Sequence, residues 1–335
     1  MNIIFSQASG LNDSIYGNCQ APIKMFIEQR GEEHENNSLL KDLFHMGTSE
    51  NFGDLLTGMT AMEGFKPVGE NGAYPTDGMQ QGYEKLLRYI TWKDSFAISK
   101  EMIEDSKLMD LKKRPQAFMT SYERTRELFG AALYANAAMG NPTFKFRGHV
   151  FDTTTADGVG LFSVKHKPKV KGAVQSNMFA DEFSVDALDR AESAMQLFRG
   201  DNDEILQVAP DTILIPNDPD LKRAVFAAVG ADKDPMTANN GFNYQFGRWR
   251  IIIWSYLNQF IPAGKKPWIL LDSKYNETYG GAVWNDRVQL EVNSYIDNGT
   301  DANVWNGRSR FNAVFNDFRF ASVGGVEGGT KLAGE

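Results

Sequence analysis

An aspartate, a serine and a histidine, the side chains of a hydrolytic triad, fall close together in the stretch 156–168, ADGVGLFSVKHKP. If this stretch is an extended strand, Ser163 and His166 are three positions apart and point to opposite faces, so they cannot bond directly. A turn could still bring the two side chains together, which keeps a hydrolase using Ser163 and His166 as an alternative. The simpler interpretation is architectural, with a turn at Asp157 and Gly158 that leads into a short strand.

Other kinds of chemistry have less support in the residues. The four histidines, His34, His45, His149 and His166, show neither an HExxH pattern nor a carboxylate at ligand spacing. Glycine never takes the GxGxxG or GxxxxGK[ST] form that cradles phosphates. A single cysteine, Cys19, excludes an intrachain disulfide and favours a reducing, intracellular origin. We therefore predict no enzyme, no cofactor and no metal.

Composition restricts the partners that the chain can have. The 335 residues are 42% hydrophobic, enough for one large or two modest domains, and no window approaches the roughly 20 apolar residues of a membrane span. The net charge is −8, and the densest basic cluster is LKKR at 111–114. Because phosphate contacts need a concentrated basic face, sequence-specific nucleic-acid binding is not expected. An acidic wall could nevertheless enclose nucleic acid without gripping it.

The N-terminal third has two features that need a neighbour. The first fifty residues are polar and weakly periodic, which is typical of an extended arm. Over 64–99, two extended segments flank a stretch crowded with Gly, Asn, Pro and Asp, which predicts a long hairpin with a mobile tip. Because this tip has too few apolar residues to bury itself, we expect it to lie on a partner.

The middle of the chain has clear helix and strand signals. Pro115 predicts the start of a long amphipathic helix over 115–139, which Gly140 and Pro142 end. A second helix is expected between Ser184 and Gly200. Further on, the stretch APDTILIPNDPDLKRAVFAAVG predicts a buried strand and then a helix, and WRIIIW and WILLD are continuous apolar runs, typical of strands buried on both faces.

The C-terminal part alternates strictly between apolar and polar residues from 283 onward, which predicts long half-buried strands. The last residues, GGVEGGTKLAGE, are expected to form a flexible tail. Taken together, the elements predict an α+β protein.

The order of these parts resembles the major capsid proteins of tailed bacteriophages, the Hong Kong 97 type of fold, and most closely the Mu-type major head subunit. YEKLLRYITWKDSFAISKEMIEDSKL is similar to the second strand of the family's extended loop, and RPQAFMTSYERTRELFGAALYANAA to its spine helix. DGVGLFSVKHKP resembles the motif that follows the spine helix in the Mu-type branch. APDTILIPNDPDLKRAVFAAV, PWILLD and FNDFRFASVGG are similar to later landmarks.

The resemblance implies a division of the chain into six parts. These are an N-terminal arm with a linking segment (1–63), the extended loop (64–99), a peripheral domain (100–180) with the spine helix at 115–139, an axial domain (181–286), return strands of the peripheral domain (287–325) and a flexible tail (326–335).

The resemblance also implies which residues meet other subunits. The tip of the extended loop would contact the adjacent subunit through Gly69, Glu70, Tyr74, Pro75, Asp77, Gly78 and Gly82. Charges of the spine helix expected at subunit contacts are Arg114, Glu123, Arg124, Arg126 and Glu127. The motif expected in the peripheral domain comprises Asp157, Gly158, Phe162, Ser163 and His166.

The function implied is that of a major capsid protein of a tailed phage or prophage. The chain would assemble with itself into pentamers and hexamers of an icosahedral shell around double-stranded DNA, in the host bacterial cytoplasm, and would reside in the virion. A separate scaffolding protein, a portal and a decoration protein are the further partners implied. An encapsulin-type nanocompartment shell, which shares the fold, is the alternative.

Overall fold

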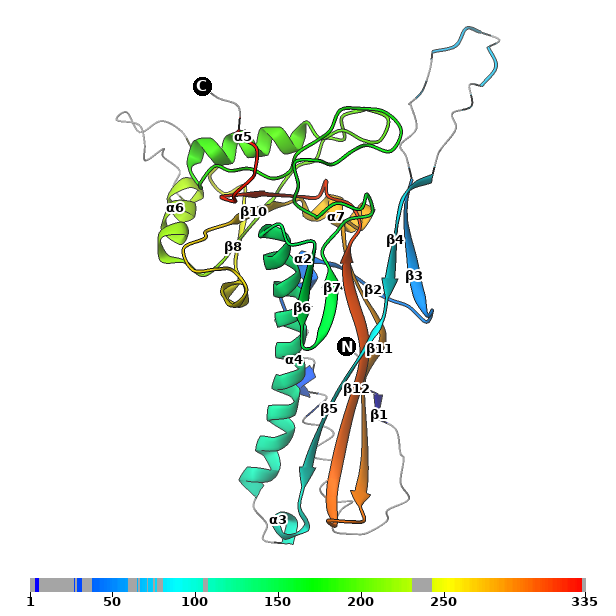
Figure 1. Ribbon diagram of the computed structural model, residues 1–335, viewed down its shortest axis with the longest axis vertical. Helices are drawn as coiled ribbons and strands as arrows, with labels where there is room; N and C mark the ends of the chain where they lie inside the picture. The colour runs from blue at the N-terminus through cyan, green and yellow to red at the C-terminus, as the bar shows by residue number, and fades with distance from the viewer. Residues whose placement is uncertain are drawn as a thin grey trace.

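The computed structural model describes residues 4–5, 27, 29–31, 38–59, 65, 67–70, 72–74, 76, 81–104, 108–230 and 243–332. It confirms the α+β class. A long helix runs beside a long sheet, a compact α/β domain lies at one end, and a separate two-stranded hairpin leaves the sheet near that domain (Figure 1).

The long helix, α4, spans Leu108–Ala138, about 46 Å at 1.5 Å per residue. It begins before Pro115, so the predicted start at that proline is wrong. Pro115 is buried inside the helix, where its missing N–H removes one helical hydrogen bond.

The sheet beside α4 has the strand order β1-β11-β12-β5, and β2 also pairs with β11. Its two longest strands, β11 (Ala282–Asp297) and β12 (Ala302–Phe315), are antiparallel, and β5 (Ile90–Ile98) continues the antiparallel pairing on β12. The two short strands β1 (Ile4–Phe5) and β2 (His45–Thr48) pair with β11 in parallel.

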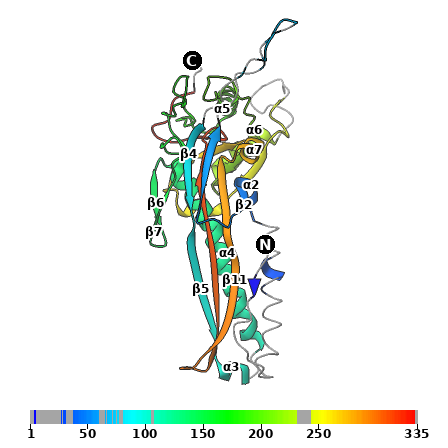
Figure 2. The same cartoon turned by 90° about the vertical axis from the view of Figure 1, so that its right-hand side faces the viewer.

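Aromatic rings fill the space between α4 and the sheet, which lie against each other in Figure 2. Phe129 of α4 contacts Trp92 and Trp284, and Trp92 stacks on Phe311 with ring centroids 5.1 Å apart. Phe151 joins the cluster from a small hairpin formed by β6 (Thr143–Phe146) and β7 (His149–Asp152). These side chains fix the helix on the sheet.

The compact domain contains a sheet with the order β13-β10-β8-β9. Its strands are β8 (Thr212–Ile215), β9 (Arg250–Ile253), β10 (Trp268–Leu271) and β13 (Ala321–Gly324), and the strands predicted from buried apolar runs all lie here. Because β13 pairs with β10, its assignment to the return strands within 287–325 is wrong. The predicted start of those strands is also too late, since β11 begins at Ala282.

Helices surround this second sheet, and their ends follow the capping rules. The helix α5 (Val185–Gln196) begins after Ser184, whose hydroxyl accepts a hydrogen bond from the N–H of Ala187. The helix α6 (Pro219–Val229) has Asp218 as its N-cap and is followed by Gly230, as the sequence predicts. The shorter elements are η1 (Ser255–Gln259) and α7 (Ser273–Tyr279).

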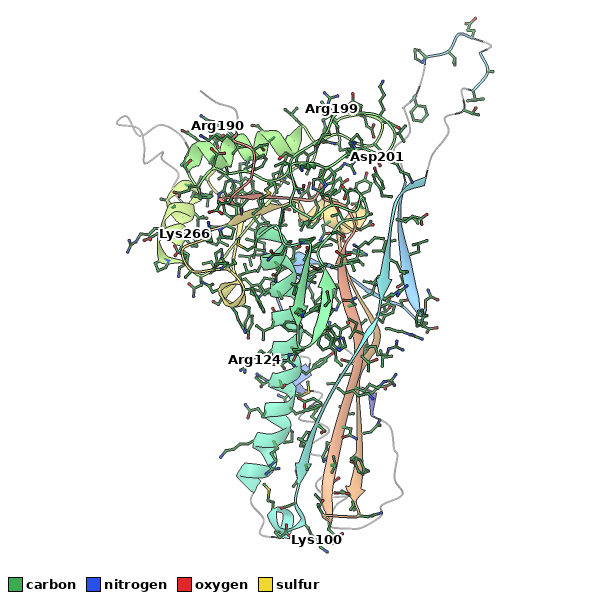
Figure 3. All side chains as sticks on the ribbon, in the orientation of Figure 1. Lys100, Arg124, Arg190, Arg199, Asp201 and Lys266 are labelled. Carbon is green, nitrogen blue, oxygen red and sulfur yellow. The ribbon has the colours of Figure 1, made fainter. Side chains whose placement is uncertain are left out.

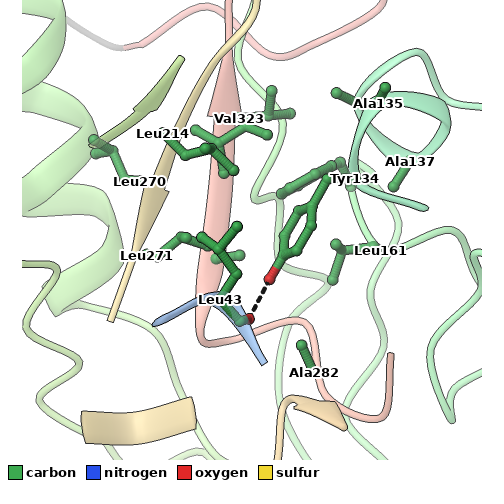
Figure 4. Close-up of a cluster of buried hydrophobic side chains, with 14 of the residues drawn as sticks. Leu43, Tyr134, Ala135, Ala137, Leu161, Leu214, Leu270, Leu271, Ala282 and Val323 are labelled. Carbon is green, nitrogen blue, oxygen red and sulfur yellow. Dashed lines mark hydrogen bonds between the residues drawn. The ribbon is translucent and has the colours of Figure 1, made fainter. Parts of the chain in front are cut away.

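The two parts share one hydrophobic core at the upper end of α4. Tyr134 donates a hydrogen bond of 2.7 Å to the carbonyl of Leu43, at the end of the short helix α2 (Leu40–Leu43), and Leu214, Leu271 and Val323 of the second sheet pack nearby (Figure 4). Leu40, Leu43 and Phe44 are all buried. Part of the segment assigned to an arm over 1–63 therefore belongs to the core, because its closely spaced apolar residues pack under α4.

The hairpin that projects from the sheet joins β3 (Gly53–Met59) to β4 (Gln81–Arg88) in antiparallel pairing. The prediction placed the hairpin over 64–99. The first strand of the observed hairpin, β3, lies before this range. The last residues of the predicted range form β5, which pairs with β12 and is not part of the hairpin. Tyr89 is the single residue between β4 of the hairpin and β5 of the long sheet.

The C-terminal residues 326–332 do not form the predicted flexible tail. Thr330 accepts a backbone bond from Ala180 and donates one to Met178, and the N–H of Leu332 bonds the carboxylate of Asp181. Val326 and Leu332 are buried. The glycines of this segment permit close approach, since a Cβ on Gly329 would lie 2.4 Å from the backbone of Phe179.

The helix α3 (Lys100–Glu104) follows β5 at the end of the molecule opposite the compact domain.

Candidate assembly surfaces

Polar contacts at its base hold the hairpin β3–β4 to the sheet. Asp54 of β3 accepts hydrogen bonds from Ser49, from Tyr89 and, at 3.0 Å, from Asn285 of β11. Partial burial raises the pKa of Asp54, but the hydrogen bonds from Tyr89 and its other donors outweigh it and hold the pKa below its ordinary value. The carboxylate is therefore charged at neutral pH and joins three parts of the chain.

Two lysines attach the second strand of the hairpin. Lys85 of β4 donates to Asp152 at 2.5 Å and to the hydroxyl of Thr154 at 2.8 Å. Lys169 donates to the backbone carbonyl of Gly82 at 2.6 Å. Together with the Asp54 contacts, these bonds set the direction in which the hairpin leaves the body.

The hairpin has one packed face and one open face. Consecutive strand residues point to opposite sides, so each of the pairs Leu55-Leu56 and Leu86-Leu87 must place one leucine on each side. Leu87 is buried, with Leu56 packed near it. Leu55 and Leu86 lie directly opposite each other in the pairing register and are 55% and 46% exposed.

Phe52, just before β3, is 77% exposed. We call Phe52, Leu55 and Leu86 the hairpin apolar surface. Leu55 and Leu86 lie on the open face of the hairpin and Phe52 in the bend before β3, where another subunit could cover them.

The predicted tip residues separate into three groups. Gly69, Glu70 and Tyr74 are exposed beyond the paired strands, and Tyr74 is 97% exposed. Pro75, Asp77 and Gly78 lie outside the described residues. Gly82 is wrong as a tip residue, because it is a buried residue of β4, where a Cβ would lie 2.7 Å from the carbonyl oxygen of Gly58.

Arg126 of the spine helix, predicted at a subunit contact, is instead buried within its own subunit. Its guanidinium forms a bidentate pair with Asp286, at 2.7 and 2.9 Å, and lies 4.9 Å from the ring centroids of Trp284 and Phe311. Burial lowers the pKa of Arg126, but Tyr122 and Asp286 raise it by more, so the arginine stays charged. A cation that is paired and buried in this way does not meet a neighbouring subunit.

The remaining helix charges divide between the core and the surface. Glu127 is buried and accepts from Ser38 at 2.6 Å and from the indole N–H of Trp254 at 3.2 Å, and Glu123 is buried with Arg30 3.8 Å away. Neither fits the predicted subunit contact. Arg114 and Arg124 are exposed, and Arg114 also bonds the carbonyl of Ala97.

The stretch 157–166 is a loop held by hydrogen bonds within the subunit. Gly158 has a φ of 79°, which suits a turn that glycine adopts without strain, and its N–H bonds the carbonyl of Thr155. Phe162 is buried. The backbone N–H of Ser163 bonds the side chain of Asn177, and the serine hydroxyl accepts from the N–H of Lys165.

His166 is fully buried and both of its ring nitrogens are engaged. Nδ1 lies 2.6 Å from Asp157, Nε2 lies 3.2 Å from the carbonyl of Leu161, and the ring stacks on Phe318 at 3.8 Å. No ring nitrogen remains for Ser163. Burial raises the pKa of Asp157, but the bonds from His166 and Thr155 lower it by more. The histidine and aspartate therefore join two parts of one loop and do not activate a nucleophile.

Within the described part of the chain, no cluster of three or more His, Cys, Asp or Glu side chains has a geometry that could hold a metal ion. The helices that the structure describes include none with the length and apolar character of a membrane span.

Comparison with solved structures finds phage proteins that are similar to this chain. The capsid protein of Ralstonia phage GP4 matches with a TM-score of 0.52 and 10% identity, covering 86% of this chain and 89% of that one. The Mycobacterium phage Patience protein matches with a TM-score of 0.49 and 12% identity over 99% and 95% of the two chains. Comparison with curated protein sequences gives no match.

The long helix on a long sheet, the projecting hairpin and the compact α/β domain are the architecture of the Hong Kong 97 type of fold. The sequence profile of the family described as phage capsid protein matches residues 86–323, and the chain belongs to that family. It is a major capsid protein, a structural component of the virion and not an enzyme, and the nanocompartment alternative is not favoured.

Sequence reasoning missed the residues that define the open face of the hairpin. Leu55 and Leu86 carry a signal, because a doubled leucine in a two-stranded ribbon places one side chain in water. The contact between Asp157 and His166 was missed as well. The sequence reasoning treated the segment that follows Gly158 as an extended strand, whereas the turn at this glycine folds it back and brings the two side chains together.

Proposed function

We propose that the subunit forms the pentamers and hexamers of a closed icosahedral shell, in which the hairpin β3–β4 lies across the adjacent subunit. The observation that supports this most is the hairpin apolar surface, held by charged contacts at its base in a fixed direction away from the core. Head-to-tail contacts of this kind close into rings when the rotation between subunits permits it.

The hairpin apolar surface would contribute to assembly through the burial of its side chains. Leu55 and Leu86 are already about half buried, so their complete burial against a neighbour would contribute on the order of 1 kcal/mol each, and that of the more exposed Phe52 roughly 1–2 kcal/mol. Such a contact is modest for one pair of subunits, but it repeats at every subunit of a shell. Small changes of angle at the hairpin would let the same surface serve both five-fold and six-fold positions.

The remaining features follow from the family resemblance. The compact domain would lie at the centre of each ring as the axial domain, and α4 with the long sheet would form the peripheral domain. The shell would enclose double-stranded DNA without reading its sequence. Assembly would take place in the host bacterial cytoplasm, with a separate scaffolding protein, a portal and a decoration protein, in a Mu-type head.

The test replaces the two facing leucines of the hairpin with charge, as L55D/L86D. The variant subunit should fold, because both side chains are exposed. We expect closed shells in electron micrographs of the wild type and only unassembled subunits in the variant.

A matched control is Leu197→Asp, which places the same charge at a leucine that is 61% exposed after α5. Its thermal midpoint should match that of the wild type and of L55D/L86D. Normal shells from L55D/L86D would overturn the assignment of the hairpin apolar surface to an assembly contact.

A further inference from the structure

The outer side of α4 carries a hollow that the proposed hairpin contact does not use, although Arg124, expected at a subunit contact from the family resemblance, is among the residues that line it. It has a volume of about 420 Å³ and is lined by Lys113, Gln116, Ala117, Thr120, Ser121, Arg124 and Arg147. We call this set the helix basic surface. The six helix residues recur every three or four positions, so they lie along one side of α4. In Figure 3, Arg124 lies on the side of the helix away from the sheet.

The charge of this surface is opposite to that of the whole chain. The chain carries a net charge of −8, yet the residues lining this hollow include three cations and no carboxylate. Asp94 of β5 accepts a 3.2 Å bond from Ser121 and borders the adjoining hollow. Among the residues that the structure describes, none forms a salt bridge with Arg124 or Arg147.

Arg147 reaches this surface from a strained turn between β6 and β7. Its φ is 46°, in the left-handed region that arginine seldom adopts, and Gly148 follows with a φ of 86°. The guanidinium carbon lies 5.8 Å from the ring centroid of Phe146, which supports the side chain from one side. A non-glycine residue in this region costs on the order of 1 kcal/mol, so the turn keeps a cation beside α4 at the expense of stability.

The kinds of side chain present favour phosphate over an acidic protein. Arginine and lysine stand beside the hydroxyl of Thr120 and the amide of Gln116, the donors that bind phosphate oxygens in nucleic-acid complexes. A docked protein helix would need apolar anchors, and Ala117 is the one apolar side chain among the lining residues. From Lys113 to Arg124 the helix spans about 16 Å, long enough to follow several phosphates of a duplex.

We propose that the helix basic surface binds the phosphate backbone of double-stranded DNA. This inference rests on the proposed function, in which the shell encloses DNA, and it adds which side of the subunit meets it. The outer side of α4 then faces the interior of the shell. Because the contacts are to phosphate alone, the binding is weak, independent of sequence and sensitive to salt.

The test measures the affinity of the full-length subunit for a labelled random duplex of about 30 base pairs, by fluorescence anisotropy between about 50 and 200 mM salt. We expect R124A/R147A to weaken binding by about tenfold or more at the lowest salt. The slope of log K against log salt should decrease by about two, one for each lost phosphate contact. R124K/R147K should keep the wild-type slope, because it keeps both charges.

The matched control is Arg223→Ala, which removes an exposed cation from α6 and should leave both affinity and slope unchanged. Equal DNA binding by the wild type and R124A/R147A would overturn the proposal. Arginine-dependent binding of poly-glutamate without arginine-dependent binding of DNA would also overturn it, and would identify an acidic protein as the ligand.

Electron microscopy of the same proteins separates this inference from the function on which it rests. If the wild type and R124A/R147A both form shells while DNA affinity is unchanged, the DNA-binding inference alone is contradicted. If the wild type forms no shells either alone or with its scaffolding partner, the proposed assembly fails, whatever the duplex measurement shows.

Discussion

At the scale of single residues, buried charge is the feature that most restricts this chain. Arg126 and Asp286 lie 160 positions apart in sequence and meet in a bidentate pair under two aromatic rings. Their side chains are 4% and 13% exposed. The pair joins the spine helix α4 to the long strand β11, so this single ion pair helps to position the helix on the sheet.

Arg126→Ala should reduce the free energy of unfolding by about 3–5 kcal/mol, because it leaves the carboxylate of Asp286 buried without its partner. Urea unfolding followed by circular dichroism measures this loss. Lys265→Ala is the control, since Lys265 and Glu327 form an ion pair in which the side chains are 40% and 86% exposed. It should cost less than about 1 kcal/mol. Equal losses in the two variants would contradict the structural role given to Arg126.

The burial of individual charged side chains was the hardest property to predict from the sequence. A charge on an amphipathic helix is normally placed on its exposed side, which agrees with the expectation from the family resemblance that Arg126, Glu123 and Glu127 meet other subunits. Their burial depends on partners supplied by distant segments, and no local pattern encodes Asp286 as one of them. Gly158 was predicted in a turn because its requirement is local, and the structure agrees.

At the scale of elements, the close approach of α2 and α4 depends on one glycine. A Cβ on Gly130 would lie 2.6 Å from Leu40 Cδ2, 3.1 Å from Trp254 Cη2 and 3.3 Å from Phe44 Cε2. The three side chains come from two segments, α2 with its C-cap Phe44 and the residue before η1, and Gly130 is the point where both reach the spine helix.

Gly130→Ala should destabilise the subunit by about 1–2 kcal/mol. Alanine improves helix propensity by about 1 kcal/mol, but overpacking of a filled core costs about 1–3 kcal/mol and exceeds that gain at this crowded position. Thermal unfolding of the purified protein tests this. Gln116→Ala, at an exposed site of the same helix, should change stability by less than about 0.5 kcal/mol. A Gly130→Ala protein more stable than the wild type would show that the contact is loose.

Elements defined by local signals were predicted well, and elements defined by pairing were not. The strand β8 and the helix α6 follow from a buried apolar run, an N-cap aspartate and a glycine stop, all within the span 212–230. The hairpin partner β3 was missed, because its register with β4 is set by contacts with Asn285 and Asp152 far along the chain. For the same reason β13 was assigned to the wrong sheet.

At the scale of the whole molecule, the subunit is elongated and keeps apolar side chains on a projecting hairpin (Figure 1). A monomer of this shape leaves those side chains in water, whereas a shell buries them at each contact. The helix basic surface lies on another part of the molecule, away from the hairpin. Assembly and DNA contact can therefore be changed independently by mutation.

The most direct measurement is electron microscopy of the purified recombinant protein, with size-exclusion chromatography on the same sample. We predict closed shells, or rings of five and six subunits, either from the protein alone or after addition of its scaffolding partner. A protein that stays monomeric at every concentration, with and without that partner, would contradict the central claim that this chain builds a capsid by contact with its own copies.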